Sequence, residues 1–287
     1  MNTFHKEALW SLLTIHIHDE ILQHSDIHEC FLRIENFEND FSRFKKWNML
    51  WNLNESGRAP ITPEIKTLVS LCKTVHKKTQ GYFDITLLPL LENAGYGIYE
   101  SPLSEKLWSD FIEITQQEII LREWIKIDFG SLWKWYMLDI LWDMLQRKWY
   151  RAFTLNFWGD IKIYGMETIL LEDPLREWNV IGKLSLENMG FAASSGNKRQ
   201  FWGKHHIMNP KNKESQNDKL AIFVTHKQGT LADLYSTALF ACPLDLSLRL
   251  LSSTPWLWGM IIDAKGKIHC TKGFQKNLTL LTKKEQN

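Results

Sequence analysis

Residues 127–139 read IDFGSLWKWYMLD, which joins an apolar segment, a small-residue turn and the start of a helix. The alternation from Trp124 to Phe129 predicts a strand that ends at Gly130-Ser131, and Lys134 then opens a helical run. The free N–H groups and the dipole at a helix N-terminus favour anions, and the lysine adds a positive charge. This stretch therefore predicts a place that holds a phosphorylated ligand.

Helix and strand patterns mix along the rest of the chain. Apolar residues from Ile27 to Phe41 fall on one helical face, and Thr62-Pro63-Glu64 caps a second helix that Gly81 ends. Further strands are predicted at 9–18, 152–157 and 219–225, helices at 134–147, 231–240 and 246–252, and hairpins over 112–129, turning at 122–124, and over 259–270. This mixture predicts an α+β fold, and with no internal repeat or linker in view we expect a single domain over 1–287.

The composition argues against several classes of protein. Lys plus Arg is 34 and Asp plus Glu is 33, so no overall charge drives binding to nucleic acid or membranes. No run approaches the ~20 apolar residues of a membrane span. The start lacks a basic region followed by an apolar one, and the four cysteines show no metal-like spacing. We therefore expect a cytoplasmic protein with reduced cysteines, or an exported one if the true start lies upstream.

Six short blocks accompany the opening stretch in a fixed order. They are FSRF (41–44), GYFDITLLPL (81–90), NFWGDI (156–161), SSG (194–196), HHIMNP (205–210) and ADLYSTALF (232–240). Their order resembles that of the FAD:protein FMN transferase family, also called the ApbE family, from about Ala8 to Phe274. The resemblance implies that family's T-fold-like architecture, with mixed, mostly antiparallel sheets and packed helices.

The resemblance also implies a reaction. Family members use Mg²⁺ to split the pyrophosphate of FAD and attach FMN to a Ser or Thr hydroxyl of a target flavoprotein, releasing AMP. Two alternatives remain open: hydrolysis of FAD to FMN and AMP, and flavin binding without catalysis.

The family's metal site maps onto four residues. Asp233 and Thr237, four apart on one helical face, match its metal-binding Asp and Thr, and Ser236 matches a position that often carries a second Asp or a Ser. Ser131 falls where a backbone carbonyl completes the site. Taken alone, the Ala-Asp-x-x-Ser-Thr pattern also suits an ordinary N-capped helix.

The remaining candidates concern the base and the flavin. His206 is the candidate general base, because an unperturbed imidazole titrates near neutral pH, although a lone histidine beside a turn is more often structural. By resemblance, Lys134 lies near the diphosphate, Asp128 contacts FAD and Phe44 stacks on the flavin ring. The other positions that match FAD-contacting residues are Leu9, Tyr82, Phe83, Asp84 and Ile207. Asn209 replaces the family's usual Asp, so the adenosine contacts are the least defined.

Tryptophan is abundant and glycine is scarce. The chain has 14 Trp and 15 Gly, and this glycine content lies below the ~7% typical of proteins. Trp10, Trp135 and Trp158 align with family glycines, while Trp124 and Trp149 stand at a turn and a helix end that favour glycine. We hypothesise that UGA codons read as glycine by the cell account for such positions. The candidates are Trp10, Trp47, Trp124, Trp133, Trp135, Trp142, Trp149, Trp158 and Trp256.

The alternative is a diverged, aromatic-rich homologue with a repacked site. Trp178 and Trp202 are interpreted as genuine tryptophans, since their sequence contexts are less restricted. The indoles of Trp133 and Trp135, beside Lys134, must either fill the space of a diphosphate or turn away from it.

Overall fold

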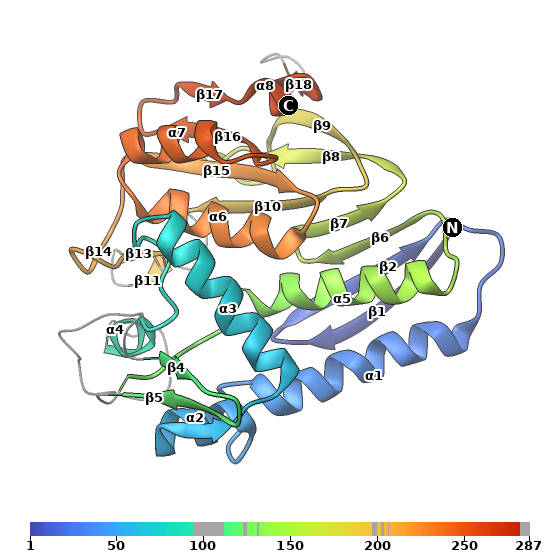
Figure 1. Cartoon of the computed structure of the whole chain (residues 1–287). Coiled ribbons are helices and arrows are strands. Elements are labelled where there is room, and N and C mark those ends of the chain that lie inside the picture. The colour runs from blue at the N-terminus through green and yellow to red at the C-terminus, as the bar shows by residue number, and fades with distance from the viewer. Residues whose placement is uncertain are drawn as a thin grey trace.

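A computed structural model describes residues 1–93, 112–122, 125–130, 132–196, 200–201, 204–205 and 207–281. These residues form a central sheet of eight strands in which every neighbouring pair is antiparallel (Figure 1). The strands in spatial order are β1 (Asn2–Ala8), β2 (Ser11–Ile17), β6 (Phe153–Phe157), β7 (Asp160–Tyr164), β10 (Gly190–Ser195), β15 (Lys219–His226), β16 (Trp258–Asp263) and β17 (Ile268–Cys270).

The central sheet is apolar on both faces. Within β15, Ile222 and Val224 belong to the larger buried cluster, whereas Ala221 and Phe223 belong to a second, smaller one. Successive side chains of a strand point to opposite faces, so the two clusters lie on opposite sides of the sheet. This is why the strand reads as a continuous apolar run.

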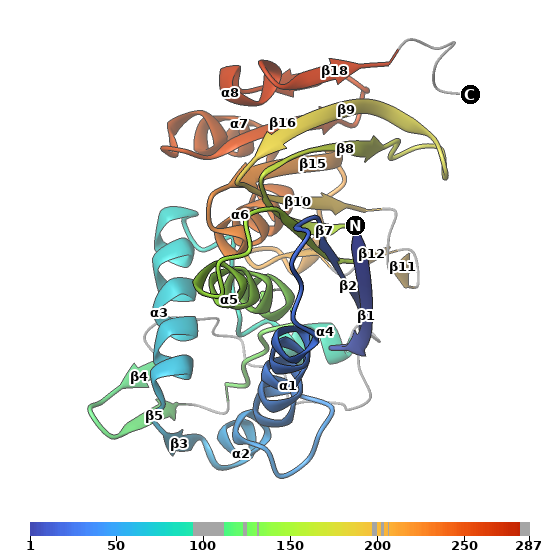
Figure 2. The ribbon, with the colours of Figure 1, turned by 90° about the vertical axis from the view of Figure 1, so that its right-hand side faces the viewer.

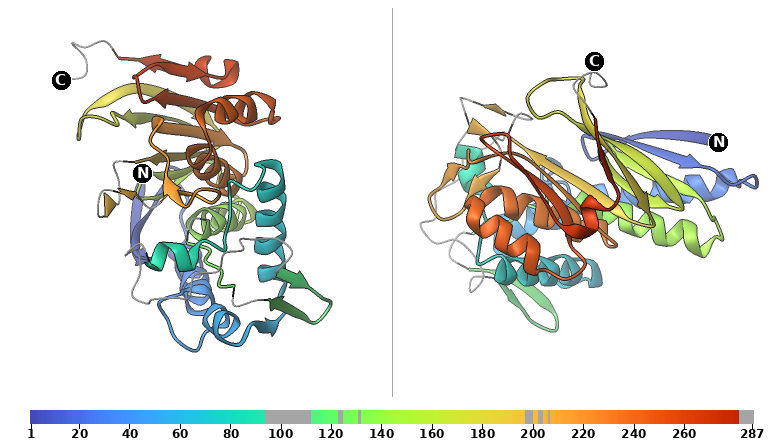
Figure 3. Two further views of the ribbon diagram at one scale, coloured as in Figure 1. Left: turned by 90° about the vertical axis from the view of Figure 1, so that its left-hand side faces the viewer. Right: turned by 90° about the horizontal axis from the view of Figure 1, so that it is seen from above.

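Helices cover the face with the larger cluster. Helix α5 (Trp133–Arg147) packs on β6 and β7, and α6 (Gly229–Ala241) packs on β10 and β15. Figure 2 shows α3 (Pro63–Lys78) outside α5 and α6, and Figure 3 shows the same separation of helices from strands from above. The other helices are α1 (His24–Phe41), α2 (Met49–Ser56), α4 (Leu88–Asn93), α7 (Leu244–Ser253) and α8 (Lys272–Gln275).

Small sheets complete the molecule. The strands β8 (Met166–Glu172), β9 (Val180–Glu187) and β18 (Leu278–Leu280) form a three-stranded sheet whose apolar residues belong to the smaller cluster. A second three-stranded sheet contains β3 (Arg58–Pro60), β4 (Ile112–Ile114) and β5 (Glu118–Leu121). Two-stranded ribbons pair β11 (Gln200–Phe201) with β12 (Lys204–His205), and β13 (Met208–Asn209) with β14 (Glu214–Ser215).

The predicted α+β class is confirmed, and several predicted elements form as expected. Thr62 caps α3 by accepting a hydrogen bond from the Ile65 N–H at 3.2 Å, and Gly81 follows the helix with a φ of 83°. No helix in the described part of the chain is both long and apolar enough to cross a membrane. The single-domain assignment stays a prediction.

The prediction for residues 112–129 was wrong in two respects. The hairpin of β4 and β5 turns at residues 115–117, earlier than the predicted turn, where Thr115 accepts hydrogen bonds from the Gln117 and Glu118 N–H groups. Residues 125–129 form no strand. The Asn54 side chain instead holds Ile127, accepting from its N–H at 2.8 Å and donating to its carbonyl at 2.9 Å. A side chain takes the place of a neighbouring strand, which alternation alone cannot reveal.

Candidate active site

A cavity of about 920 Å³ lies beside α6, the start of α5 and the ends of several strands. It collects residues that are far apart in the sequence. Ten of the thirteen candidate residues line it: Leu9, Phe44, Tyr82, Phe83, Asp84, Asp128, Lys134, Ile207, Asp233 and Thr237. The structure therefore brings the predicted aromatic, cationic and metal-binding residues into one space.

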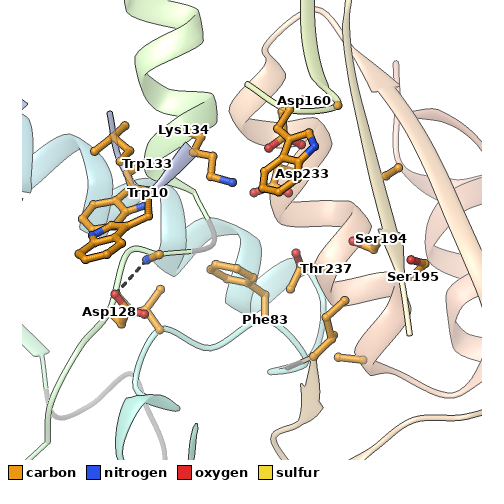
Figure 4. Close-up of a pocket in the computed structure, with 18 of the residues that line it drawn as sticks. Trp10, Phe83, Asp128, Trp133, Lys134, Asp160, Ser194, Ser195, Asp233 and Thr237 are labelled. Carbon is orange, nitrogen blue, oxygen red and sulfur yellow. Dashed lines mark hydrogen bonds between the residues drawn. The ribbon is translucent and has the colours of Figure 1, made fainter. Parts of the chain in front are cut away.

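Lys134 provides the cationic side of the cavity. It is the second residue of α5, so its side chain stands where the helix also presents its first N–H groups. Figure 4 shows Lys134 reaching toward Asp160 and Asp233 across the cavity. The combination of dipole and lysine suits an anion, as the sequence predicted.

Asp233 and Thr237 come from α6 and face the cavity one helical turn apart. Their position depends on Asp139 of α5, which accepts hydrogen bonds from the Gly229 and Thr230 N–H groups, both at 2.9 Å. Lys162, almost fully buried, pairs with Asp139 at 2.8 Å. A carboxylate from one helix thus caps the other and fixes the metal-binding candidates relative to Lys134.

Ser236 lies behind this wall. Its buried hydroxyl contacts Ser194 Oγ at 2.8 Å and donates to the Asp233 carbonyl at 3.0 Å, so it joins α6 to β10. The side chain is not among those that line the cavity, and its role as a metal ligand stays a prediction. Ser131 and His206 lie outside the described residues, so their roles also stay predictions.

Aromatic and charged side chains form the opposite end. The Arg43 guanidinium lies 4.5 Å from the centre of the Phe44 ring, and the Trp10 ring lies 5.0 Å from that of Phe44. Arg43 Nε is 3.8 Å from Asp128 Oδ2. Sequence reasoning missed Arg43, although a basic residue beside the aromatic of the FSRF block was a usable signal.

Two carboxyl groups in the cavity have shifted pKa values. Burial raises the pKa of Asp84 to about 6, although hydrogen bonds from Thr86 to its Oδ1 act in the opposite direction. Burial also raises the pKa of Asp128, opposed by the nearby Arg43 and by the Gly130 N–H, which donates at 3.0 Å. Both groups are carboxylates held in an environment that disfavours their charge.

The charge balance of the cavity bears on metal binding. Among the described lining residues, the carboxylates of Asp84, Asp128, Asp160, Glu172 and Asp233 outnumber the cations of Arg43 and Lys134. A diphosphate entering this space meets repulsion that a divalent cation would relieve. Asp160 and Glu172 were not predicted, though Asp160 falls within the NFWGDI block.

The donor set fits Mg²⁺ in its chemistry. The part of the chain that the structure describes has no group of three or more His, Cys, Asp or Glu side chains arranged to hold a metal. Mg²⁺, however, binds through one or two carboxylates and keeps waters and substrate oxygens. The Asp233 carboxylate and the Thr237 hydroxyl supply oxygen ligands of this kind.

The two tryptophans beside Lys134 differ. Trp133 lines the cavity and packs edge-on against Phe37, whereas Trp135 turns away into the core, only 1% exposed. The Trp135 ring lies against Gly190 and Gly229, where an added Cβ would come within 3.2 Å and 2.2 Å of ring carbons. The backbone of both is helical, so the glycine hypothesis at 133 and 135 stays a prediction.

Known proteins resemble this chain over nearly its whole length. The ApbE family model matches residues 10–258. The chain belongs to the ApbE family. A Klebsiella pneumoniae protein named FAD:protein FMN transferase is 23% identical over 250 residues, which cover 80% of this chain and 78% of the relative. The predicted family is thus confirmed, and with it the expectation of an enzyme.

Solved ApbE structures share the fold. The ApbE protein of Thermotoga maritima has a TM-score of 0.87 at 19% identity, covering 96% of this chain and 98% of its own. The flavinyl transferase ApbE of Pseudomonas stutzeri has a TM-score of 0.82 at 18% identity, covering 96% of each chain. The flavin transferase ApbE of Vibrio cholerae has a TM-score of 0.82 at 16% identity, covering 96% and 98%. The architecture expected from the resemblance is therefore confirmed.

Proposed function

We propose that this ApbE-family chain is an FAD:protein FMN transferase that requires Mg²⁺ and attaches FMN to a Ser or Thr hydroxyl of a target flavoprotein. The observation that carries the proposal is the convergence of Lys134, Asp233 and Thr237 on a cavity with aromatic residues at its other end. A flavin needs the aromatic end, and its diphosphate needs the cationic, oxygen-rich end.

In the transfer, the acceptor oxygen bonds to the FMN phosphorus and the bond from that phosphorus to the AMP oxygen breaks. Phosphoryl chemistry of this type depends mainly on positioning and charge stabilisation. Lys134 and the α5 N-terminus would hold the diphosphate, and Asp233 and Thr237 would hold Mg²⁺, which offsets charge on the leaving group. His206 would take the proton of the acceptor hydroxyl.

The two alternative functions differ in product. With water as acceptor, the same site would release free FMN and AMP, while a binding protein would leave FAD unchanged. We expect the purified protein, incubated with FAD, Mg²⁺ and the acceptor flavoprotein of the K. pneumoniae relative, to produce AMP and covalently flavinylated acceptor. The K. pneumoniae enzyme serves as the positive control.

Chromatography of the nucleotides and intact mass of the acceptor separate the outcomes. FMN on the acceptor supports transfer, free FMN in equal amount to AMP indicates hydrolysis, and intact FAD indicates binding alone. Asp245→Ala is a matched control, because this aspartate is exposed on α7, pairs only with Arg249 among printed ion pairs, and does not line the cavity. It should leave the products unchanged.

A further inference from the structure

The backbone singles out one residue type. In the described part of the chain, ten non-glycine residues have a positive φ, and six of them are tryptophans. The six, with their φ angles, are Trp10 (58°), Trp47 (68°), Trp149 (68°), Trp158 (47°), Trp178 (67°) and Trp256 (63°). No phenylalanine or tyrosine among the described residues has this conformation. Aromatic bulk therefore does not explain the pattern, since L-residues with large side chains avoid this region.

Two of the six lie in tight hairpin turns. Ala8 pairs with Ser11 and Phe157 with Asp160, so each loop has two residues, Leu9-Trp10 and Trp158-Gly159. All four loop residues have positive φ, as a type I′ turn requires. Such turns strongly prefer glycine, asparagine or aspartate.

Trp149 follows the last turn of α5. Its N–H donates to the Gln146 carbonyl at 2.9 Å, and the Tyr150 N–H donates to the Leu145 carbonyl at 3.2 Å. These two bonds define a Schellman motif with Trp149 at the left-handed C′ position, which is usually glycine.

Trp256 lies in the turn after α7. Pro255 and Trp256 are its central residues, and the Leu257 N–H donates to the Thr254 carbonyl at 3.4 Å. Proline followed by a residue with positive φ is the pattern of a type II turn, whose third position calls for glycine.

Trp47 and Trp178 also lie in loops. Trp47 directly precedes Asn48, the N-cap of α2, and Trp178 lies in the turn between β8 and β9. The earlier interpretation of Trp178 as a genuine tryptophan is contradicted by this backbone, which its sequence context did not reveal.

None of the six gains burial that would offset the strain. Their side chains are between 72% and 97% exposed. By contrast, Trp142 has a helical backbone within α5, is partly buried, and donates from its indole Nε1 to the Ile163 carbonyl at 3.2 Å. The protein thus contains tryptophans that fit their sites and tryptophans that only a glycine backbone would suit.

We propose that the natural protein carries glycine at positions 10, 47, 149, 158, 178 and 256, encoded by UGA codons that its cell reads as glycine. Six more glycines bring glycine to about 7% of the chain, the usual share. Tryptophan falls correspondingly from its unusual abundance. The proposal concerns the backbone and does not depend on the proposed function.

One consequence does rest on the proposed function. Positions 10 and 158 line the cavity. Glycine at both removes two exposed indoles from its border and leaves more room for an acceptor protein to bring a hydroxyl to the flavin phosphate.

The direct test is peptide mass spectrometry of the protein purified from its native cells, together with the codons of its gene. We expect UGA codons and glycine masses at the six positions, with UGG codons and tryptophan masses at positions 51 and 142. Tryptophan mass at any of the six overturns the proposal for that position, whatever its codon.

A recombinant comparison tests the physical argument independently of any activity. The variant with all six Trp→Gly changes should have a melting temperature on the order of 10 °C above that of the all-tryptophan protein, because each left-handed position loses its strain. The control Trp142→Gly should lower it, since glycine weakens a helix interior and removes a packed ring. An unchanged or lower melting temperature for the six-glycine variant would contradict the assignment.

Discussion

Two regions that border the cavity follow different rules. The wall formed by α5 and α6 joins Lys134, Asp233 and Thr237 to a helix interface that Asp139 holds by hydrogen bonds. The two hairpin turns at 9–10 and 158–159 instead place tryptophans on left-handed backbone. In the wall, side chain and backbone agree, whereas in the turns they conflict. The conflict occurs where the residue is tryptophan, which places the anomaly in residue identity and not in the fold.

The largest effect should come from the wall. Asp233→Ala removes a carboxylate that we assign to Mg²⁺, so metal-dependent turnover should fall by about 100-fold or more, as for other groups that stabilise charge in the transition state. AMP release from FAD measures it, with Asp245→Ala as the control. Activity equal to wild type would remove Asp233 from the site and leave the wall no more important than the turns.

A smaller loss should follow from the other side of the wall. Lys134→Met keeps the length of the side chain but removes its charge, so FAD affinity should fall about tenfold, the value of one charge-assisted contact. Arg147→Met, at the opposite end of α5, is the matched control. Equal losses in both variants would show that general charge, and not the position of Lys134, attracts FAD.

The turns should respond in stability. Trp256→Gly should raise the free energy of unfolding by about 1 kcal/mol, the cost of a left-handed L-residue. Urea unfolding of this variant beside Trp51→Gly, a change within helix α2, separates the effect of φ from that of losing an indole. If both changes destabilise the protein alike, the turn backbone accepts tryptophan and the contrast between the regions disappears.

The smallest effect concerns Asp84. Its pKa is about 6 in the folded protein, above the ordinary value of 3.8, so the folded state binds the proton more tightly. Its contribution to stability is therefore fully present below about pH 4 and is lost as pH rises through about pH 6. Asp84→Asn does not titrate, so its stability relative to wild type should increase by less than about 1 kcal/mol from pH 4.5 to pH 7.5. Urea midpoints at both pH values measure this, and a constant difference would refute the shift.

Much of the fold could be predicted because local signals were sufficient. The apolar face of α1 and the cap of α3 depend on neighbours in the sequence, and both elements formed as expected. Residues 125–129 were predicted as a strand because alternation does not distinguish a paired strand from a segment held by Asn54. That pairing joins residues 73 apart and leaves no local trace.

The site was predictable to the extent that its blocks carry their own residues. Asp233 and Thr237 share a helix, so their common face followed from spacing. The contact of Asp139 with Gly229, 90 residues away, decides how α6 meets α5 and could not be predicted. Arg43 was missed because its value comes from its contacts with Phe44 and Asp128, which only the structure supplies.

The central claim is that the wall of α5 and α6 binds the FAD diphosphate together with a cation held by Asp233. Isothermal titration of FAD with excess Mg²⁺ and with a chelator tests it most directly, and riboflavin, which lacks phosphate, serves as the internal control. We predict that wild-type protein binds FAD at least about tenfold more tightly with Mg²⁺, and that Asp233→Ala and riboflavin show no such difference. Equal FAD affinity of the wild-type protein with and without Mg²⁺ would contradict the account.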